Sequence, residues 1–330
     1  MRLGGNTDWM VEVKNGGELQ EAISWAARHE LPVIVIGGGS NIIWRDEGFR
    51  GLMIRNKIMH YQEQAVPGEP TAIYVTVGAG ENWDDIVART TIQRLTGIEA
   101  MSLIPGTAGA TPIQNVGAYG QEIADVLVSL EAYDTKTEQF VTIMASDCGF
   151  GYRTSRFKTT DRGRFCITQL KLKLTYGNPQ PPFYPGVQHF LDDKGIVNPT
   201  AQTIRDAVMA IRRTKLPDPE KIPNCGSFFG NPVLNEDYST GMLANYPTMP
   251  RWGCNNGKVR IPAAWLIEQA GFKNFYDQET GMATWAMQPL IFINKNAKFT
   301  SELFVFRQKI IDIVKQKFGI ILEQEPDILP

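Results

Sequence analysis

The residues with the clearest chemical potential form a glycine-rich segment, residues 102–120, which reads S-L-I-P-G-T-A-G-A-T-P-I-Q-N-V-G-A-Y-G and carries no charged side chain. Glycine lets a backbone approach a ligand closely, and small side chains leave backbone N–H groups uncovered, so such a segment can hold phosphate oxygens without a basic residue. Gln114 and Asn115 add amide groups that could bind a flat heterocycle. A buried crossover loop is the alternative interpretation, because Gly and Pro mark loops of every kind.

A second neutral loop, G-G-G-S-N at residues 37–41, follows a short apolar run. A dinucleotide-binding Rossmann unit requires G-x-G-x-x-G at the start of a helix. Here position 42 is Ile, and the residues after it predict a strand. The loop therefore indicates backbone amides near a ligand and not a Rossmann unit.

Three further sites carry groups that could take part in chemistry. Residues 148–158, C-G-F-G-Y-R-T-S-R-F-K, place three cations among small residues. Ser227 stands between Gly226 and two phenylalanines, and Glu323 and Glu325 lie near the end of the chain. The alternatives are a solvated basic turn, a structural serine and two solvated acids.

The sequence does not fit a Ser-His-Asp hydrolase. Ser227 does not lie in the G-x-S-x-G nucleophile elbow. The histidines, His29, His60 and His189, all lie outside the glycine-rich loops.

Apolar periodicity predicts the elements that position these groups. Helices are expected at 18–30, 82–91, 201–213, 261–271 and 301–318. Strands are expected at 31–36, 42–44, 52–55, 73–77, 129–133, 140–144, 168–174, 287–294 and 320–325. Residues 61–70 read as a polar linker, and residues 176–195 as a long irregular loop, which is either functional or disordered.

The bulk composition is that of an ordinary globular protein, with 330 residues, 43% hydrophobic and 21% charged residues and a net charge of −2. This length predicts two or three domains, and the charge argues against a general nucleic-acid binder. Its four cysteines fit no zinc-binding pattern, so we expect free thiols in a reducing cytoplasm and no metal. No apolar run approaches the roughly 20 residues of a membrane helix, so no membrane association is expected.

Taken in order, the motifs resemble the UDP-N-acetylenolpyruvoylglucosamine reductase family over about Asn6 to Glu325. They are the loops at 37–41 and 102–120, the turn at 148–158, R-T-K-L-P-D-P at 213–219 and G-S-F-F-G-N-P at 226–232. Each motif is weak alone, whereas the ordered set is specific. The resemblance implies an α+β fold with a two-lobed FAD-binding region of the vanillyl-alcohol-oxidase/PCMH-like type and a third α/β substrate-binding lobe. The expected segments are 1–65, 66–215, 216–318 and a C-terminal strand, 319–330, which returns to the active site.

The resemblance also implies the ligands: non-covalent FAD, NADPH as co-substrate and a UDP-sugar substrate. In this family NADPH reduces the flavin, and UDP-N-acetylglucosamine enolpyruvate then takes a hydride to give UDP-N-acetylmuramate for peptidoglycan precursors. We expect a cytoplasmic monomer. The positions implied for FAD lie in the two glycine-rich loops and are Gly37, Gly38, Gly39, Ser40, Asn41, Pro105, Gly106, Thr107, Gly109, Ala110, Gln114, Asn115, Gly117, Ala118 and Tyr119.

Three positions match the family's catalytic residues. Arg153 and Glu325 would stabilise the enol-like intermediate, and Ser227 would protonate its C2 carbon. The positions implied for substrate contacts are Tyr152, Tyr176, Lys215, Asn231 and Gln288. Among these, Tyr176 matches the substrate-covering tyrosine of the type I branch.

The sequence departs from the family pattern at Pro326-Asp327, where Val-Arg is usual, and residues 235–288 are the least family-like. Two alternatives remain open. The first is another FAD-dependent sugar or alcohol oxidoreductase with the same flavin-binding fold. The second is a nucleotide-sugar-binding protein without catalysis.

Overall fold

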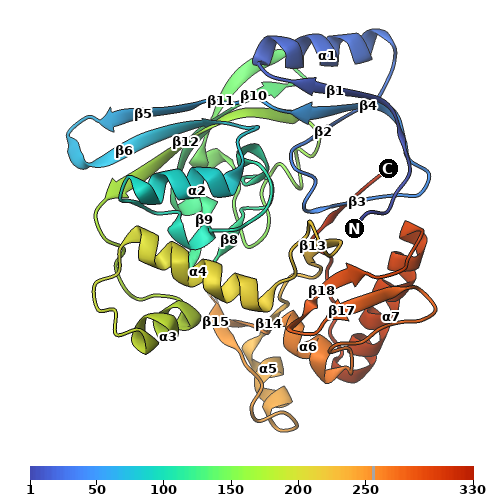
Figure 1. The fold of residues 1–330 in the computed structure, drawn as a ribbon. Coiled ribbons are helices and arrows are strands. Elements are labelled where there is room, and N and C mark those ends of the chain that lie inside the picture. Colours follow the sequence, from blue (N-terminus) through green and yellow to red (C-terminus); the bar gives the residue numbers. More distant parts are fainter. Residues whose placement is uncertain (255–256) are drawn as a thin grey trace. The chain divides into compact units, whose positions relative to one another are not determined.

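The computed structural model describes residues 1–254 and 257–330, and these fall into two compact units. Unit 1 comprises residues 1–6, 40–48 and 213–330, and unit 2 comprises residues 7–39 and 49–212. Both units combine helices with sheets, as the α+β expectation requires (Figure 1). The four expected segments, with a division at residue 65, stay a prediction.

A three-stranded parallel sheet opens unit 2, in the order β1 (Thr7–Val13), β4 (Phe49–Asn56) and β2 (Val33–Ile36). Helix α1 (Gly16–Arg28) lies along this sheet (Figure 1). Its N-terminus is capped by Asn15, which accepts a 2.9 Å hydrogen bond from the Glu18 amide, while Glu18 accepts one from Lys14 N. This reciprocal capping explains why the helix begins here. Strand β2 leads directly into the Gly37–Gly39 loop.

A six-stranded antiparallel sheet forms the centre of unit 2. Its order is β11 (Gln139–Met144), β10 (Leu127–Asp134), β12 (Phe165–Tyr176), β6 (Glu69–Gly78) and β5 (Tyr61–Val66), with β7 (Leu95–Thr96) paired to β12. Its core includes Val75, Trp83 of helix α2 (Trp83–Ile92) and Leu170, all fully buried. The remaining elements of this unit are the short pair β8 (Gly117–Ala118) and β9 (Gln121–Glu122) and helix α3 (Pro185–Asp193). Helix α4 (Ala201–Lys215) crosses the boundary between the units.

Unit 1 contains two three-stranded sheets and a parallel pair. The first sheet has the order β13 (Asn224–Ser227), β18 (Gln288–Asn294) and β17 (Met282–Trp285). The second has the order β14 (Val233–Asn235), β16 (Lys258–Arg260) and β15 (Trp252–Cys254). The parallel pair is β3 (Ile42–Trp44) with β19 (Asp327–Leu329). Its helices are α5 (Glu236–Leu243), α6 (Ala263–Gln269) and α7 (Thr300–Phe318). Asp46 accepts hydrogen bonds from the first two amides of α7, Thr300 N at 2.6 Å and Ser301 N at 2.9 Å. The cap of α7 therefore comes from a residue distant in sequence.

Three expectations about secondary structure are wrong. Residues 61–70 are not a linker, because β5 and the start of β6 form a hairpin across Gly68, whose φ is +76°. Residues 176–195 are not irregular throughout: Pro185 opens α3, since proline suits the first turn of a helix, and Val187 and Leu191 bury one face. Residues 320–325 form no strand, and the last strand is β19.

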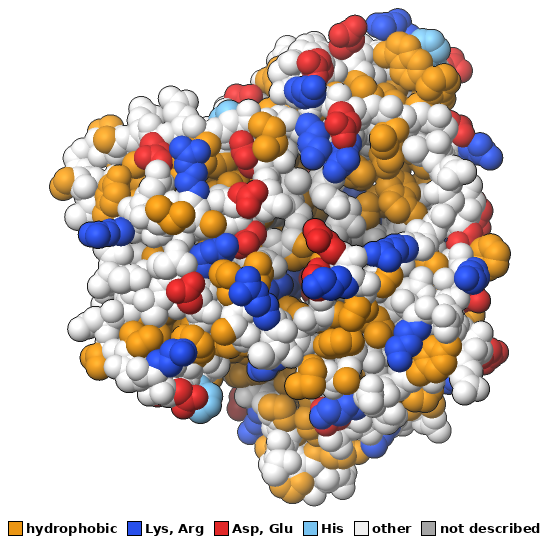
Figure 2. All heavy atoms as spheres, in the orientation of Figure 1, with side chains coloured by type: hydrophobic (Ala, Val, Ile, Leu, Met, Phe, Trp, Pro, Cys, Tyr) orange, Lys and Arg blue, Asp and Glu red, His pale blue; other side chains and the backbone are white. Residues whose placement is uncertain are grey.

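Figure 2 shows one face of the molecule, on which Lys and Arg side chains are interspersed with Asp and Glu side chains of the described residues. A nucleic-acid-binding surface would instead gather cations on one face. Within residues 1–254 and 257–330, no helix combines the length and apolarity needed to cross a membrane.

Candidate active site

Unit 2 brings the two glycine-rich loops into contact. A Cβ atom at Gly37 would collide with the Thr107 side chain, and one at Gly38 would lie 3.1 Å from Gly106 Cα. Gly39 and Gly106 have φ values of +69° and +117°, a region that glycine occupies readily. These glycines thus allow the two loops to pack closely, Gly37 against the Thr107 side chain and Gly38 against the Gly106 backbone. Neutral loops of small residues are the kind of surface that can hold phosphate oxygens. Ser40 and Asn41, the other expected members of the first loop, belong to unit 1.

The start of the glycine-rich segment is held at Leu103, whose φ is +56°. Asp84 accepts a 2.6 Å hydrogen bond from Leu103 N, and Arg212 donates one of 3.1 Å to Leu103 O. Arg205 in turn donates two hydrogen bonds to the Asp84 carboxylate, of 2.5 and 2.9 Å. Burial raises the pKa of Asp84, but Arg205 and the Leu103 amide outweigh it and hold the pKa below its usual value. The ionised Asp84 therefore stabilises an unusual backbone conformation next to Pro105.

Asn115 has a different role from the one expected. Its side chain is fully buried; Nδ2 donates to Gly151 O at 3.1 Å, and Oδ1 accepts from Ala124 N at 3.1 Å. A group with no exposed surface cannot contact a cofactor directly, so the Asn115 side chain ties the glycine-rich segment to the following turn. The amide oxygen of Gln114 accepts a 3.2 Å hydrogen bond from Lys158 Nζ.

Arg153 occupies the turn at residues 148–158, and this turn is fastened to the glycine-rich segment. Arg153 Nη2 donates a 2.6 Å hydrogen bond to Gly117 O, and Ser155 Oγ donates one of 2.6 Å to Ile113 O. The Tyr152 ring lies 5.2 Å from the Arg153 guanidinium carbon. Arg153 has a φ of +53°, which is uncommon for a residue with a side chain and occurs often at functional sites. Within unit 2 the structure thus places Arg153 and Tyr152 beside the segment expected to hold FAD.

Two exposed tyrosines lie in or near the proline-rich stretch, Tyr176 and Tyr184. Tyr176, the expected one, ends β12 opposite Leu95 of β7. Tyr184, which the sequence analysis missed, precedes α3, and its ring meets the ring of Tyr119 edge-on at 5.3 Å. The signal that could have found it is Pro185, which marks a helix start just after a tyrosine in the proline-rich stretch.

In unit 1, Ser227 is the last residue of β13 and lies next to packed aromatic side chains. It pairs with Ile291 of β18 and is half-buried. The following Phe228 stacks on Phe292 with ring centroids 4.3 Å apart. Burial raises the pKa of the nearby Cys225 thiol to about 12, so this thiol stays protonated and is a poor nucleophile. Ser227 is thus held at a strand end that is packed on aromatic side chains.

The C-terminal segment lies directly beside that strand end. Glu325 N donates a 2.9 Å hydrogen bond to Phe228 O, and Gly230 N donates one of 3.0 Å to Glu323 O. These bonds form an isolated antiparallel bridge between Gln324 and Phe229, in place of the strand expected at residues 320–325. Glu323 is exposed, whereas Glu325 is half-buried. Asp327 N then donates a 3.1 Å hydrogen bond to Asn41 O, so unit 1 brings Ser227, Glu325 and Asn41 into one neighbourhood.

The expected substrate contacts of unit 1 surround Trp285 and α6. Trp285 Nε1 donates a 3.1 Å hydrogen bond to the carbonyl of Lys215, whose side chain is exposed at the end of α4. Gln288 pairs with Trp285 at the start of β18. Asn231 Oδ1 accepts a 2.9 Å hydrogen bond from Ala263 N and thereby caps α6. Trp285 therefore contacts both Lys215 and Gln288. Asn231 has a structural role at the start of α6.

Comparison with known proteins finds two family matches, one in the N-terminal and one in the C-terminal part of the chain. Residues 7–143 match the FAD binding domain family, and residues 218–329 match the C-terminal domain of UDP-N-acetylenolpyruvoylglucosamine reductase. The reductase of Ralstonia nicotianae is 38% identical over 322 residues, covering 97% of this chain and 93% of the relative. The chain belongs to the UDP-N-acetylenolpyruvoylglucosamine reductase family. It is therefore an oxidoreductase with an FAD-binding domain, and the family expected from the motifs is confirmed.

Other members of this reductase family are similar over the same range. The Pseudomonas putida reductase is 36% identical over 97% of this chain and 93% of its own length, and that of Neisseria gonorrhoeae is 36% identical over 97% and 91%. The crystal structure of the reductase from Thermus caldophilus matches with a TM-score of 0.66 at 20% identity and covers 97% of this chain and 92% of its own. This last similarity confirms the expected fold.

Proposed function

We propose that the protein catalyses the NADPH-dependent reduction of UDP-N-acetylglucosamine enolpyruvate to UDP-N-acetylmuramate, a step of bacterial peptidoglycan precursor synthesis. The observation that carries this proposal is the match of residues 218–329 to the reductase's own C-terminal domain, because this region contains Ser227 and Glu325 with adjoining backbones. An FAD-binding domain alone would fit many oxidoreductases.

The residues of both glycine-rich loops fit FAD. Gly37 and Gly38 let the first loop pack directly against Thr107 and Gly106 of the second, and neutral loops of small residues offer backbone amides to a pyrophosphate. When bound, the flavin supplies the hydride. We assign FAD binding to these loops, in which the buried Asn115 ties the glycine-rich segment to the turn at residues 148–158.

The protein's own groups stabilise charge and deliver a proton. Addition of a hydride to the enol ether leaves negative charge that spreads into the adjacent carboxylate. Arg153 offers a planar, permanently charged donor for that carboxylate, and such preorganised donors are often the largest contribution to catalysis. Ser227 then gives its proton to the C2 carbon, and a proton from solvent restores its hydroxyl; before the transfer, the neutral hydroxyl adds no charge to an anionic site. Glu325 assists in stabilising the intermediate, and Tyr152, Lys215, Asn231 and Gln288 bind the substrate.

The purified protein is expected to be yellow with non-covalently bound FAD. The reason is that neither glycine-rich loop contains a histidine or cysteine to which a flavin could be attached. Denaturation with acid or heat should release free FAD into the supernatant. Flavin that stays on the denatured chain would contradict this expectation.

Tyr184 is expected to matter more for sugar-nucleotide binding than Tyr176. The ring of Tyr184 touches Tyr119 of the glycine-rich segment, whereas Tyr176 is paired in a sheet. A residue at the edge of a site can order on ligand binding and exclude water. Tyr184→Phe should therefore raise the KM for the UDP-sugar more than the KM for NADPH, with Tyr176→Phe as the matched control. A larger effect of Tyr176→Phe would restore the family-based assignment.

Steady-state assays test the proposed function. NADPH oxidation by the purified enzyme should depend on the enolpyruvyl UDP-sugar and yield UDP-N-acetylmuramate. An oxidase of the same flavin-binding fold would instead consume oxygen with a sugar or alcohol as reductant. Oxidation of such a reductant, with no response to the enolpyruvyl sugar, would overturn the proposal.

A further inference from the structure

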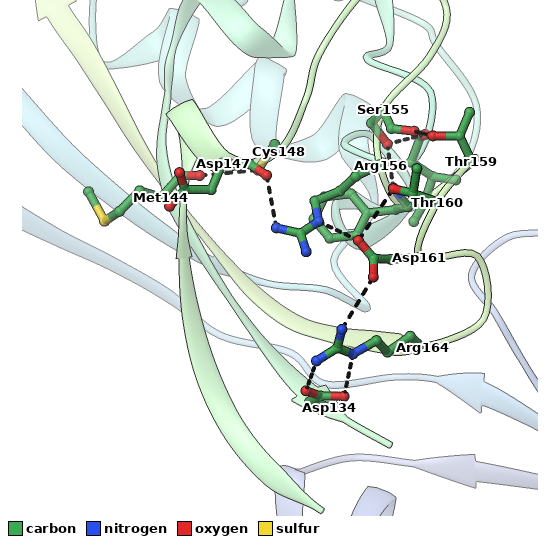
Figure 3. Close-up of polar contacts among 12 residues, drawn as sticks. Asp134, Met144, Asp147, Cys148, Ser155, Arg156, Thr159, Thr160, Asp161 and Arg164 are labelled. Carbon is green, nitrogen blue, oxygen red and sulfur yellow. Dashed lines mark hydrogen bonds and ion pairs between the residues drawn. The ribbon is translucent and has the colours of Figure 1, made fainter. Parts of the chain in front are cut away.

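A chain of alternating charges connects the central sheet of unit 2 to the turn that carries Arg153 (Figure 3). Arg164 holds Asp134 of β10 with two hydrogen bonds, Nε to Oδ1 at 2.9 Å and Nη2 to Oδ2 at 2.7 Å. Arg164 Nη1 also lies 3.3 Å from Asp161 Oδ1, and Arg156 Nε lies 2.6 Å from Asp161 Oδ2. Asp161 is thus the link between two arginines, one anchored on the sheet and one in the turn.

Arg156 closes the base of the turn. Its Nη1 donates a 3.0 Å hydrogen bond to Asp147 O, and its backbone N donates one of 2.9 Å to Cys148 O. These two bonds join the beginning and the end of the segment in which Arg153 lies. The position of the Arg156 side chain therefore sets where the base of the turn sits relative to the sheet.

The two acids of this chain of charges are largely shielded from solvent, which favours fixed positions for their side chains. The Asp134 side chain is 3% exposed and that of Asp161 15% exposed, and each acid has an arginine partner. Hydrogen bonds from Arg164 hold the pKa of Asp134 well below its usual range, and the hydrogen bond from Arg156 lowers the pKa of Asp161. Two-pronged contacts between arginine and carboxylate fix direction as well as distance, and connected networks hold their members more firmly than isolated pairs.

The opposite side of the turn rests on the glycine-rich segment through Arg153 and Ser155. Asn115 Nδ2 also donates a 3.1 Å hydrogen bond to Gly151 O from this side. The turn is therefore held by the glycine-rich segment on one side and by Arg156 at its base.

We propose that Asp161 is a positioning residue for Arg153: by joining Arg156 to the sheet-anchored Arg164, it fixes the turn so that the Arg153 guanidinium meets the developing carboxylate charge. This inference rests on the proposed function for the role of Arg153. Asp161 itself touches neither substrate nor cofactor in this proposal and acts through Arg156.

The test compares Asp161→Asn with Asp147→Asn. The first change removes the charge that holds both arginines. Asp147 is a matched control because its exposed carboxylate accepts only a 3.5 Å hydrogen bond from Ser146 among the described residues, and Arg156 contacts its backbone. Asp161→Asn should slow reoxidation of the reduced enzyme by the enolpyruvyl sugar about tenfold, less than the roughly 10²-fold that a 1 Å misplacement can cost. Reduction by NADPH should change less than about twofold, and Asp161→Glu should recover part of the loss.

A second readout does not depend on the reaction. Gly151 and Thr154 exchange backbone hydrogen bonds of 3.1 and 3.3 Å within the turn. Their amides should exchange hydrogen faster in Asp161→Asn than in the wild type, and not in Asp147→Asn. If Asp161→Asn does not fold, Arg156→Gln removes the same link from the other side and should show the same two effects. If both single variants fold, the double variant should lose no more than the worse of them, since the two residues act through one connection.

Unchanged amide exchange, or equal slowing of both half-reactions, would overturn the positioning role. Failure of the wild-type enzyme to react with the enolpyruvyl sugar would instead overturn the proposed function, while faster exchange in Asp161→Asn would still support the anchoring of the turn.

Discussion

Replacing Ser227 by alanine is expected to leave reduction of the bound flavin by NADPH nearly intact while reoxidation by the enolpyruvyl substrate slows by roughly 10²- to 10⁴-fold, the usual effect of a positioned general acid. This corresponds to roughly 3 to 5 kcal/mol of activation free energy. The split arises because only the second half-reaction protonates a carbon atom. Ser227 is held at the end of β13 by pairing with Ile291, and Phe228 stacks on Phe292 beneath it. Removing one oxygen atom should therefore leave the backbone in place.

Stopped-flow measurement of the two half-reactions in the same Ser227→Ala preparation provides the control. The rate of reduction by NADPH reports whether FAD is bound in its normal environment. Equal slowing of both half-reactions, or loss of FAD during purification, would mean that Ser227 supports the structure and does not deliver the proton.

The second large effect is expected at Glu325, where Glu325→Gln should slow reoxidation by at least about tenfold with FAD still bound. Removing a charge that is fixed beside a reacting group removes stabilisation which solvent does not replace. Glu325 is half-buried, and its backbone is bonded to Phe228, next to Ser227. Pro326 restricts Glu325 to an extended conformation, which helps to hold the side chain in place.

Glu323→Gln is the matched control, because Glu323 is exposed and lies two residues away in the same segment. It should cost little, since a solvated carboxylate contributes weakly. Asp327 stands where the family usually has Arg, and its amide is bonded to Asn41 in this chain. A defect in Glu323→Gln larger than that in Glu325→Gln would reverse the assignment of the functional acid.

The elements that could be predicted from the sequence are those with local signals. Helix α1 has its capping pair at Asn15 and Glu18, and α7 ends at Gly319, whose φ of +66° suits a helix C-terminus. The two glycine-rich loops were recognisable because each combines small residues with the absence of charge. The family resemblance implied only that both loops bind FAD, and nothing in the spacing of Gly37 and Thr107 predicts the contact between them.

The features that escaped prediction depend on pairing between distant residues. Strand β19 pairs with β3, so Asp327 lies opposite Ile42 across most of the chain length. The cap of α7 comes from Asp46 for the same reason. The sequence of β5 predicts a linker because Gln62, Glu63 and Gln64 are exposed on an edge strand, where polar side chains hide the alternation.

The candidate site shows the same division. The roles expected of Arg153, Ser227 and Glu325 were implied by the family resemblance, but the groups that hold these residues did not stand out. Asp84 at Leu103 and Asp161 at Arg156 read as ordinary surface acids in the sequence, and only the fold reveals which backbone or arginine each one contacts.

Anaerobic single-turnover spectroscopy tests the central claim most directly. The purified enzyme is titrated with NADPH until the flavin absorbance is bleached, and the reduced enzyme is then mixed with UDP-N-acetylglucosamine enolpyruvate. Our account predicts full recovery of the oxidised flavin spectrum and one equivalent of UDP-N-acetylmuramate for each flavin. A reduced enzyme that stays bleached with this substrate, and regains its colour only when oxygen is admitted, would contradict the account.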